Sequence, residues 1–276
     1  MPADFSLVDE SAWPCSPAHR PAYEDAVERG RKRMAQTRAV FCALARDVAD
    51  VLPANIERLE ALGGRFAGHA VVVYENDSTD ATPELLAAWQ ATDSRVHVES
   101  ERLGLPRFPP TRDLERAAWL AQCRNSVRKR ALEDFGDFDW AIVLDLDLLG
   151  YCPDGMASSF GHESFDAMGS NGMSFFRGRP MFYDSWAFRT HAHPEPFLAR
   201  DIRFAVLPRG VPPQPVRSCF GGLAIYRMEA FRAATYAGHD CEHVCLHQGL
   251  RAAGYEEIFI NPSMIARYPD ADALWH

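Results

Sequence analysis

Three short apolar runs constrain the fold of this chain more than any other feature. They are Ala39–Ala45, Ala70–Tyr74 and Trp140–Leu144, and none of them alternates with polar residues. A strand that is apolar along its whole length is typical of a parallel sheet covered on both faces. Helical spacing of apolar residues separates the runs, at Val48–Leu62 and Arg112–Phe135. The chain therefore predicts parallel strands joined by crossover helices.

The second half of the chain is less regular. Strands are predicted at Ala167–Gly169, Met181–Phe188 and Gly222–Arg227. A helix is predicted at Asp240–Ala253, followed by a final strand at Glu257–Ile260.

Acidic and polar clusters follow two of the apolar runs directly. The segment from Glu75 to Asp80 follows the second run, and Asp145 and Asp147 follow the third. In open α/β sheets, ligands bind beyond the carboxyl ends of the strands. We therefore expect the functional site at this edge of the sheet, between the two clusters.

Composition and charge exclude several classes of protein. The 276 residues are 47% hydrophobic and 24% charged, which excludes a disordered or collagen-like chain. No run of about 18 apolar residues occurs, so we expect no transmembrane helix. A net charge of −9 argues against a general nucleic-acid binder, because contacts with phosphate dominate such binding. Seven cysteines, an odd count, and no secretion signal in residues 1–13 indicate a cytoplasmic location.

Asp145 and Asp147 suggest a divalent metal site. A strand would direct both side chains to one face, and oxygen ligands without thiolates suit Mg²⁺ or Mn²⁺ beside a phosphate. The alternative is a strand-to-loop turn with solvated carboxylates. Arg124 and Asn125, on the preceding helix, offer a fork of donors for phosphate and an amide that can bind a base or ribose.

In order and spacing, residues 39–150 resemble the GT-A glycosyltransferases. That family has an acidic strand end followed by Ser-Thr-Asp, then Arg-Asn on a helix, then Asp-x-Asp, matched here by residues 75–80, 124–125 and 145–147. The rest of the chain resembles a narrower group, the fungal capsular mannosyltransferases. The matching stretches are residues 182–187, 219–222, 241–247 and 258–262.

The resemblance implies a fold and an activity. The fold is a GT-A-like three-layer α/β/α sandwich with a mostly parallel, mixed central sheet. The activity is metal-dependent transfer of a sugar, with mannose and retention of configuration favoured. The donor would be a nucleotide-diphosphate sugar, such as GDP-mannose or a UDP-sugar, and the acceptor a glycan, a lipid-linked molecule or a protein. Peripheral attachment to the inner membrane is left open.

The same resemblance divides the chain and assigns roles. Residues 1–35 would be an N-terminal arm, 36–150 the nucleotide-sugar-binding half, and 151–276 the half that binds the donor sugar and the acceptor. The nucleotide-binding residues would be Glu75, Asn76, Asp77, Arg124 and Asn125. The ligands of Mn²⁺ or Mg²⁺ would be Asp145, Asp147 and His247. The catalytic residues would be Asp184 and Glu242.

Alternatives to this interpretation use the same residues. A metal-dependent phosphohydrolase or nucleotidyltransferase would act through the two aspartates without a sugar acceptor. A non-catalytic nucleotide-sugar-binding protein would bind the nucleotide without turnover. For His247, the alternative to a ligand role is a histidine that is hydrogen-bonded in the core.

Overall fold

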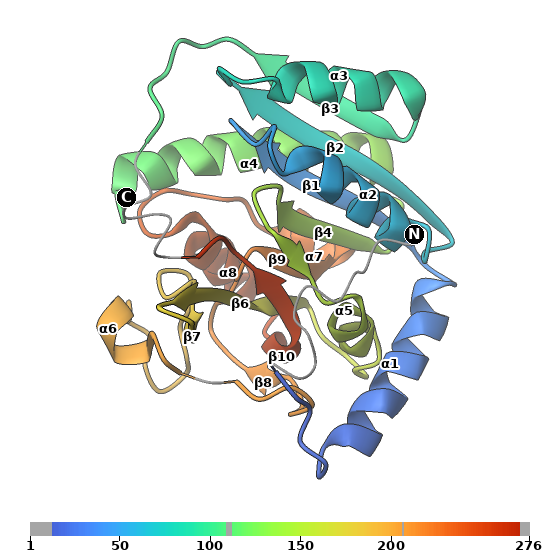
Figure 1. The fold of residues 1–276 in the computed structure, drawn as a ribbon, viewed down its shortest axis with the longest axis vertical. Coiled ribbons are helices and arrows are strands. Elements are labelled where there is room, and N and C mark those ends of the chain that lie inside the picture. The colour runs from blue at the N-terminus through green and yellow to red at the C-terminus, as the bar shows by residue number, and fades with distance from the viewer. Residues whose placement is uncertain (1–12, 109–111, 206, 271–276) are drawn as a thin grey trace.

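A computed structural model describes residues 13–108, 112–205 and 207–270, which form three layers with a central sheet between helices (Figure 1). Residues 1–12 of the predicted arm and residues 271–276 of the predicted second half lie outside the described residues. One continuous sheet passes through both predicted halves of the chain.

The sheet has the strand order β3-β2-β1-β4-β9-β6-β10-β5, with β7 beside β6 and β8 beside β10. The strands are β1 Arg38–Ala45, β2 Gly68–Asn76, β3 Val96–Glu101, β4 Trp140–Asp145, β5 Gly150–Tyr151, β6 Ala167–Phe176, β7 Arg179–Phe182, β8 Gln214–Pro215, β9 Leu223–Arg227 and β10 Ile258–Arg267. Strands β3, β2, β1 and β4 are parallel, and β9 runs antiparallel between β4 and β6. The predicted mostly parallel, mixed sheet is confirmed.

Helices cover both faces of this sheet. They are α1 Arg20–Met34, α2 Leu52–Gly63, α3 Thr82–Thr92, α4 Leu114–Phe135, α5 Pro153–Phe160, α6 Ala199–Ile202, α7 Met228–Ala233 and α8 Glu242–Ala252. Helices α1, α2, α3 and α5 contribute to the core on one face, and α4, α7 and α8 to the core on the other. Among the described residues, no helix combines the length and the apolar character needed to cross a membrane.

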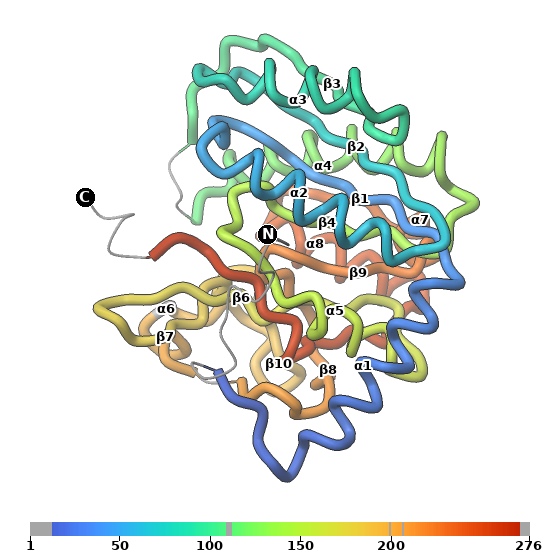
Figure 2. The backbone as a smooth tube through the Cα atoms, turned by 45° about the vertical axis from the view of Figure 1, so that its right-hand side comes forward, coloured from blue at the N-terminus to red at the C-terminus, as the bar shows by residue number. Residues whose placement is uncertain are grey.

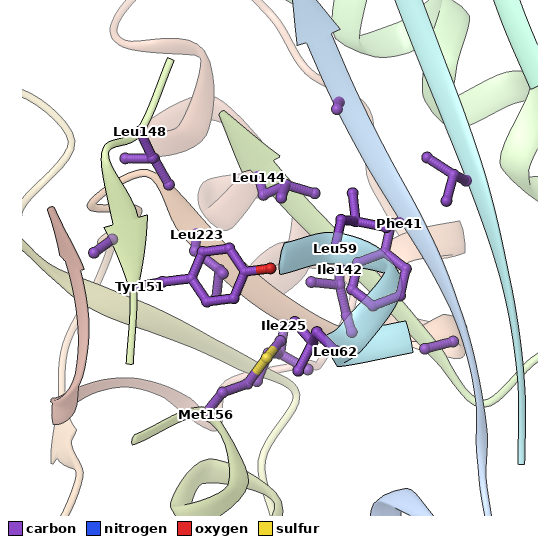
Figure 3. Close-up of a cluster of buried hydrophobic side chains, with 14 of the residues drawn as sticks. Phe41, Leu59, Leu62, Ile142, Leu144, Leu148, Tyr151, Met156, Leu223 and Ile225 are labelled. Carbon is purple, nitrogen blue, oxygen red and sulfur yellow. The ribbon is translucent and has the colours of Figure 1, made fainter. Parts of the chain in front are cut away.

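The continuous apolar runs are explained by these two cores. In β1, Phe41 and Ala43 pack into one core, while Val40 and Cys42 pack into the other. Figure 3 shows Phe41 beside Leu59 of α2 in the first core. Burying a side chain of this size contributes about 1.5–3 kcal/mol, so a polar residue on either face of β1 would be costly.

Three strands of the second half differ from the prediction. Strand β6 continues past Gly169 to Phe176, where it pairs with β7. Strand β7 ends at Phe182 instead of Phe188, because the chain turns around Asp184, whose carboxylate accepts the N–H of Ala187 at 3.2 Å. Strand β10 continues past Ile260 to Arg267, and its pairing with β6 shifts register between Asn261 and Ile265.

Helices α1 and α5 touch backbone to backbone at two glycines. A Cβ atom on Gly30 would lie 1.7 Å from the carbonyl oxygen of Ala157, and one on Gly161 would lie 1.9 Å from that of Ala26. Neither position has room for a methyl group unless the helices separate.

We therefore expect Gly30→Ala to lower the free energy of unfolding by at least about 1–3 kcal/mol, the usual cost of overpacking a core. Gly64→Ala is the matched control, because its Cβ would lie 3.4 Å from the nearest atom and its φ of −63° suits alanine. That variant should be neutral or slightly stabilised. Chemical denaturation measures both, and equal stability of the two variants would contradict the close approach of the helices.

Candidate active site

The carboxyl ends of β1, β2 and β4 open onto a cleft of about 910 Å³. Residues of α4, of β7 with the turn that follows it, and of the first turn of α8 complete its walls. The predicted site residues that line this cleft are Asn76, Arg124, Asp145, Asp147, Asp184 and Glu242. The edge of the sheet predicted from the strand order is therefore where these groups meet.

Asp145 is held from two sides. Nη2 of Arg124 donates to Oδ1 at 3.0 Å, and the hydroxyl of Tyr268 donates to Oδ2 at 2.8 Å. The backbone N–H of Asp145 donates to the carbonyl of Gly222, which has a φ of +92°. A Cβ on Gly222 would lie 2.6 Å from the Tyr268 hydroxyl oxygen, so only glycine leaves room for this arrangement.

Asp147 is placed by its neighbours but has a free carboxylate. Leu146 and Leu148 are buried in the core, and Nδ2 of Asn55 donates to both of their carbonyl oxygens at 2.9 Å. The intervening Asp147 is exposed and lines the cleft, and no other described residue donates a hydrogen bond to its carboxylate. The enclosing walls of the cleft and the nearby Asp145 raise the pKa of Asp147 to about 7.

Arg124 connects Asp145 to α8. Its side chain is 7% exposed, its Nε donates to Oε1 of Glu242 at 3.1 Å, and its Cζ lies 5.0 Å from the ring centre of Phe220. Burial opposes the charge, but the carboxylates of Asp145 and Glu242 outweigh it and raise the pKa of Arg124. Its Nη1 is buried and has no partner among the described residues, which leaves a donor for an anion in the cleft.

Asp184 and Glu242 lie in the cleft with different surroundings. The two oxygens of Asp184 accept the backbone N–H groups of Ala187 and Gly221, and burial raises the pKa of Asp184. Glu242 is the first residue of α8, is buried, and is paired with Arg124.

Two predicted residues at the end of β2 do not line the cleft. The buried carboxylate of Glu75 accepts hydrogen bonds from the N–H of Ser78 and the hydroxyl of Ser100. Asp77, with a φ of +54°, accepts the N–H groups of residues 103 to 105. Desolvation raises the pKa of Asp77, but the hydrogen bonds from Asn76 and these amides outweigh it and lower the pKa to about 2. Both carboxylates hold the loops beside the cleft.

Asn125 also has a structural partner. Its side-chain amide donates to the carbonyl of Tyr236 at 2.9 Å and accepts the N–H of Tyr236 at 3.0 Å. This pair fastens α4 to the segment after α7, and Asn125 does not line the cleft.

The structure does not bring His247 to Asp147. Its Nδ1 lies 2.9 Å from the hydroxyl oxygen of Ser218 and its Nε2 lies 3.2 Å from that of Tyr226. Burial, with a smaller effect of Arg251, lowers the pKa of His247 to about 3, so the ring is neutral. This geometry favours the core alternative.

His243, one helical turn earlier on α8, lines the cleft instead. Its ring is 2% exposed and stacks on Phe220 with the ring centres 3.6 Å apart. Neither ring nitrogen has a hydrogen-bond partner among the described residues. Burial, with a contribution from Arg124, holds the pKa of His243 well below its usual range.

Sequence reasoning missed Tyr268 and Tyr183. Their rings stack in the cleft wall with centres 3.8 Å apart, and Tyr268 follows directly after β10. The prediction ended β10 at Ile260, too early to include this region. Because β10 pairs parallel with β6, a strand of the full length would have indicated that its carboxyl end reaches the edge of the sheet where the cleft lies.

His247→Ala tests the placement of this ring. We expect a loss of a few kcal/mol in the free energy of unfolding of the metal-free protein, because a cavity opens and two buried partners lose a hydrogen bond. Nucleotide affinity of the folded protein should be unchanged. His239→Ala is the control on the same region, because His239 is exposed. Thermal denaturation and nucleotide titration measure both properties, and normal stability with weakened metal-dependent binding would place His247 in the site.

Comparison with known proteins identifies the family of this chain. The chain matches the protein family described as Cryptococcal mannosyltransferase 1 over residues 38–254. This match includes all the predicted cleft residues and excludes Tyr268. No curated protein sequence matches the chain.

Solved structures share the fold at low sequence identity. The mannosyltransferase PcManGT from Pyrobaculum calidifontis, in complex with GDP-Man and Mn²⁺, aligns with a TM-score of 0.52 and 15% identity over 92% of this chain and 66% of that one. GalNAc-T7 with UDP, GalNAc and Mn²⁺ aligns with a TM-score of 0.53 and 11% identity, over 98% of this chain and 56% of that one. S. aureus TarS 1–349 aligns with a TM-score of 0.50 and 13% identity, over 87% of this chain and 62% of that one.

At these identities the likeness concerns the fold, and this chain spans less than two thirds of each of those chains. The resemblance drawn from the sequence motifs is nonetheless confirmed by the family match, which covers more than half of the chain. This chain therefore belongs to the glycosyltransferase family of cryptococcal mannosyltransferase 1 and has the GT-A fold.

Proposed function

We propose that the protein transfers a sugar, mannose in the first instance, from a nucleotide-diphosphate sugar with the help of Mn²⁺ or Mg²⁺. One observation carries most of this proposal. The free carboxylate of Asp147 lies in the same cleft as the buried Arg124–Asp145 pair, at the carboxyl ends of parallel strands. The cleft volume of about 910 Å³ is also within the range of small-molecule sites.

In this proposal the nucleotide lies against the ends of β1 and β2, where Ala45, Val48 and Asn76 line the cleft. The diphosphate then reaches Asp147 and Arg124. Arg124 donates to a phosphate oxygen through Nη1, the nitrogen that has no protein partner among the described residues. The complexes of PcManGT with GDP-Man and of GalNAc-T7 with UDP support a nucleotide donor.

The residues present fit a cation that is bound together with the substrate. Among the described residues, no group of three or more His, Cys, Asp and Glu side chains could hold a metal ion. Mg²⁺ is usually bound by one or two carboxylates with substrate phosphates and water, and Asp147 has the free carboxylate for this role. Asp145, with both oxygens engaged, contributes its charge nearby. The bound cation would stabilise the charge that develops on the departing diphosphate.

The remaining carboxylates orient the sugar. Asp184 is fixed by two backbone N–H groups, so its free lone pairs can accept hydrogen bonds from sugar hydroxyls in a constant geometry. Glu242 is held by Arg124 and lies at the same wall of the cleft. Both stay in the proposal as residues that contact the donor sugar or the acceptor.

Asp147→Asn tests the cation site. The amide keeps the shape of the side chain but removes the charge that a cation needs, so we expect turnover to fall by about a hundredfold or more. The metal-free protein should be at least as stable as the unaltered one, because an unfavourable charge beside Asp145 is removed. Release of nucleotide from GDP-mannose or a UDP-sugar, measured against Mn²⁺ concentration, checks this expectation.

Asp154→Asn is the matched control, because Asp154 is half exposed and pairs with Arg31 on α1. Normal turnover and a normal Mn²⁺ response in Asp147→Asn would contradict the cation site. Nucleotide release that never yields a glycosylated acceptor would favour the hydrolase alternative, and nucleotide binding without release would favour the binding-protein alternative.

Tyr268→Phe tests whether Asp145 must be held in place. The variant keeps the ring that stacks on Tyr183 but loses the hydroxyl that donates to Asp145. We expect Mn²⁺-dependent nucleotide affinity to fall by about 10–100-fold, as for other groups that orient metal-site residues, with little change in melting temperature. Calorimetric titration of GDP with and without Mn²⁺ measures this.

The matched control for that experiment is Tyr151→Phe, which removes a buried hydroxyl that has no partner among the described residues. If both tyrosine variants bind the nucleotide and the metal alike, Tyr268 does not act on the site through Asp145.

A further inference from the structure

The cleft continues beyond Asp184 to a flank formed by β7 and the segment that follows α6. Figures 1 and 2 both show β7 and α6 next to each other on one side of the molecule, away from β1, β2 and β3. The cleft is lined there by Phe176, Met181, Phe182 and Arg203. If the nucleotide occupies the ends of β1 and β2, as proposed above, this flank is the part of the cleft that remains for the acceptor.

Two arginines of this flank lie against aromatic rings. Cζ of Arg179 is 4.3 Å from the ring centre of Phe204, and Cζ of Arg203 is 5.8 Å from that of Phe176. Neither guanidinium forms an ion pair or donates a hydrogen bond to another described residue. A guanidinium that stacks by its face keeps its in-plane N–H groups for an anion. The flank therefore presents two positive groups that are held in place and lack a counter-charge.

Several other basic groups in the described part of the chain are engaged with protein partners. On α1, Arg31 pairs with Asp154 and Lys32 pairs with Glu28. Near the flank itself, Arg112 donates to the carbonyl of Phe197 and to the hydroxyl of Ser185. In a chain with a net charge of −9, unpaired arginines that line or border a cleft point to an anionic ligand.

Apolar side chains accompany these arginines. Phe204, which stacks on Arg179, is 42% exposed and is one of the few large hydrophobic residues exposed in the described part of the chain. Phe176, Met181 and Phe182 extend the apolar surface into the cleft. A sugar needs hydrogen-bonding groups, whereas this combination of guanidinium and hydrocarbon suits a molecule with a phosphate joined to an apolar chain.

We infer that the acceptor is carried on a lipid-type phosphate, whose phosphate binds Arg179 and Arg203 and whose chain lies along Phe176 and Phe204. This inference rests on the proposed function and names its acceptor class. In the transfer, a hydroxyl of the acceptor forms a bond to C1 of the donor sugar. The bond from C1 to the diphosphate breaks, the nucleotide diphosphate leaves with the electron pair, and the hydroxyl proton passes to solvent.

Binding of geranyl phosphate to the full chain tests the inference. The titration is done with saturating GDP and Mn²⁺ present, so that the nucleotide part of the cleft is occupied. Geraniol and inorganic phosphate are titrated alongside. We expect geranyl phosphate to bind at least about tenfold more tightly than either, because only it engages both parts of the flank. Equal affinity for geraniol, or for inorganic phosphate, would overturn the inference.

Variants locate the binding to this flank. Arg179→Gln and Arg203→Gln should each weaken geranyl phosphate binding by about tenfold, because each removes a charge-assisted hydrogen bond, and should leave geraniol binding unchanged. Arg200→Gln is the matched control, because Arg200 is on the same segment but is highly exposed and paired with Asp201. Unchanged geranyl phosphate affinity in both test variants would overturn the inference.

The proposed function is tested separately by release of nucleotide from GDP-mannose or a UDP-sugar by the unaltered protein without acceptor. If the donor is cleaved but geranyl phosphate binds no better than its fragments, the acceptor class is wrong and the proposed function stands. If geranyl phosphate binds through Arg203 but no donor is bound or cleaved, the proposed function fails and the anion-binding flank stands.

Discussion

The cleft depends on the buried guanidinium of Arg124. It joins α4 to Asp145 at the end of β4 and to Glu242 at the start of α8, residues that lie 21 and 118 positions away along the chain. Burying charges is stabilising only when each one keeps its partners, and removing one member leaves the others uncompensated. The guanidinium of Arg124, placed between the two carboxylates, therefore holds α4, β4 and α8 together. It also fixes the position of Asp145.

The carboxylates of the cleft divide into those with protein partners and those without. Asp145, Asp184 and Glu242 all receive hydrogen bonds from the protein, so their positions are set before any ligand arrives. Asp147 receives none from another described residue, and its raised pKa reflects the enclosing walls of the cleft together with the negative charge of Asp145 beside it. An arrangement that is costly in the free protein and relieved by a cation is typical of a ligand site.

Local side-chain contacts explain where the predicted strands were wrong. Residues 181–188 have the composition of a strand, yet the carboxylate of Asp184 accepts the N–H of Ala187 and turns the chain.

At the end of β2, the neighbours Glu75 and Asn76 are equally polar, but only Asn76 lines the cleft. Glu75 is occupied by Ser78 and Ser100, one of which lies on the next strand. Such partners cannot be identified from the spacing along one segment.

The sequence by itself determined the parallel order of β1, β2 and β4 and the edge of the sheet at which Asn76, Asp145 and Asp147 meet, because residues buried on both faces must be apolar and crossover helices keep the strands parallel. Only the tertiary structure decided which helical turn of α8 reaches the cleft. As a result, His243 lines the cleft, whereas His247 lies in the core. It also decided that Tyr268 holds Asp145. The physical reason is that a local pattern sets the period of an element, whereas its rotation and its contacts depend on packing against distant parts of the chain.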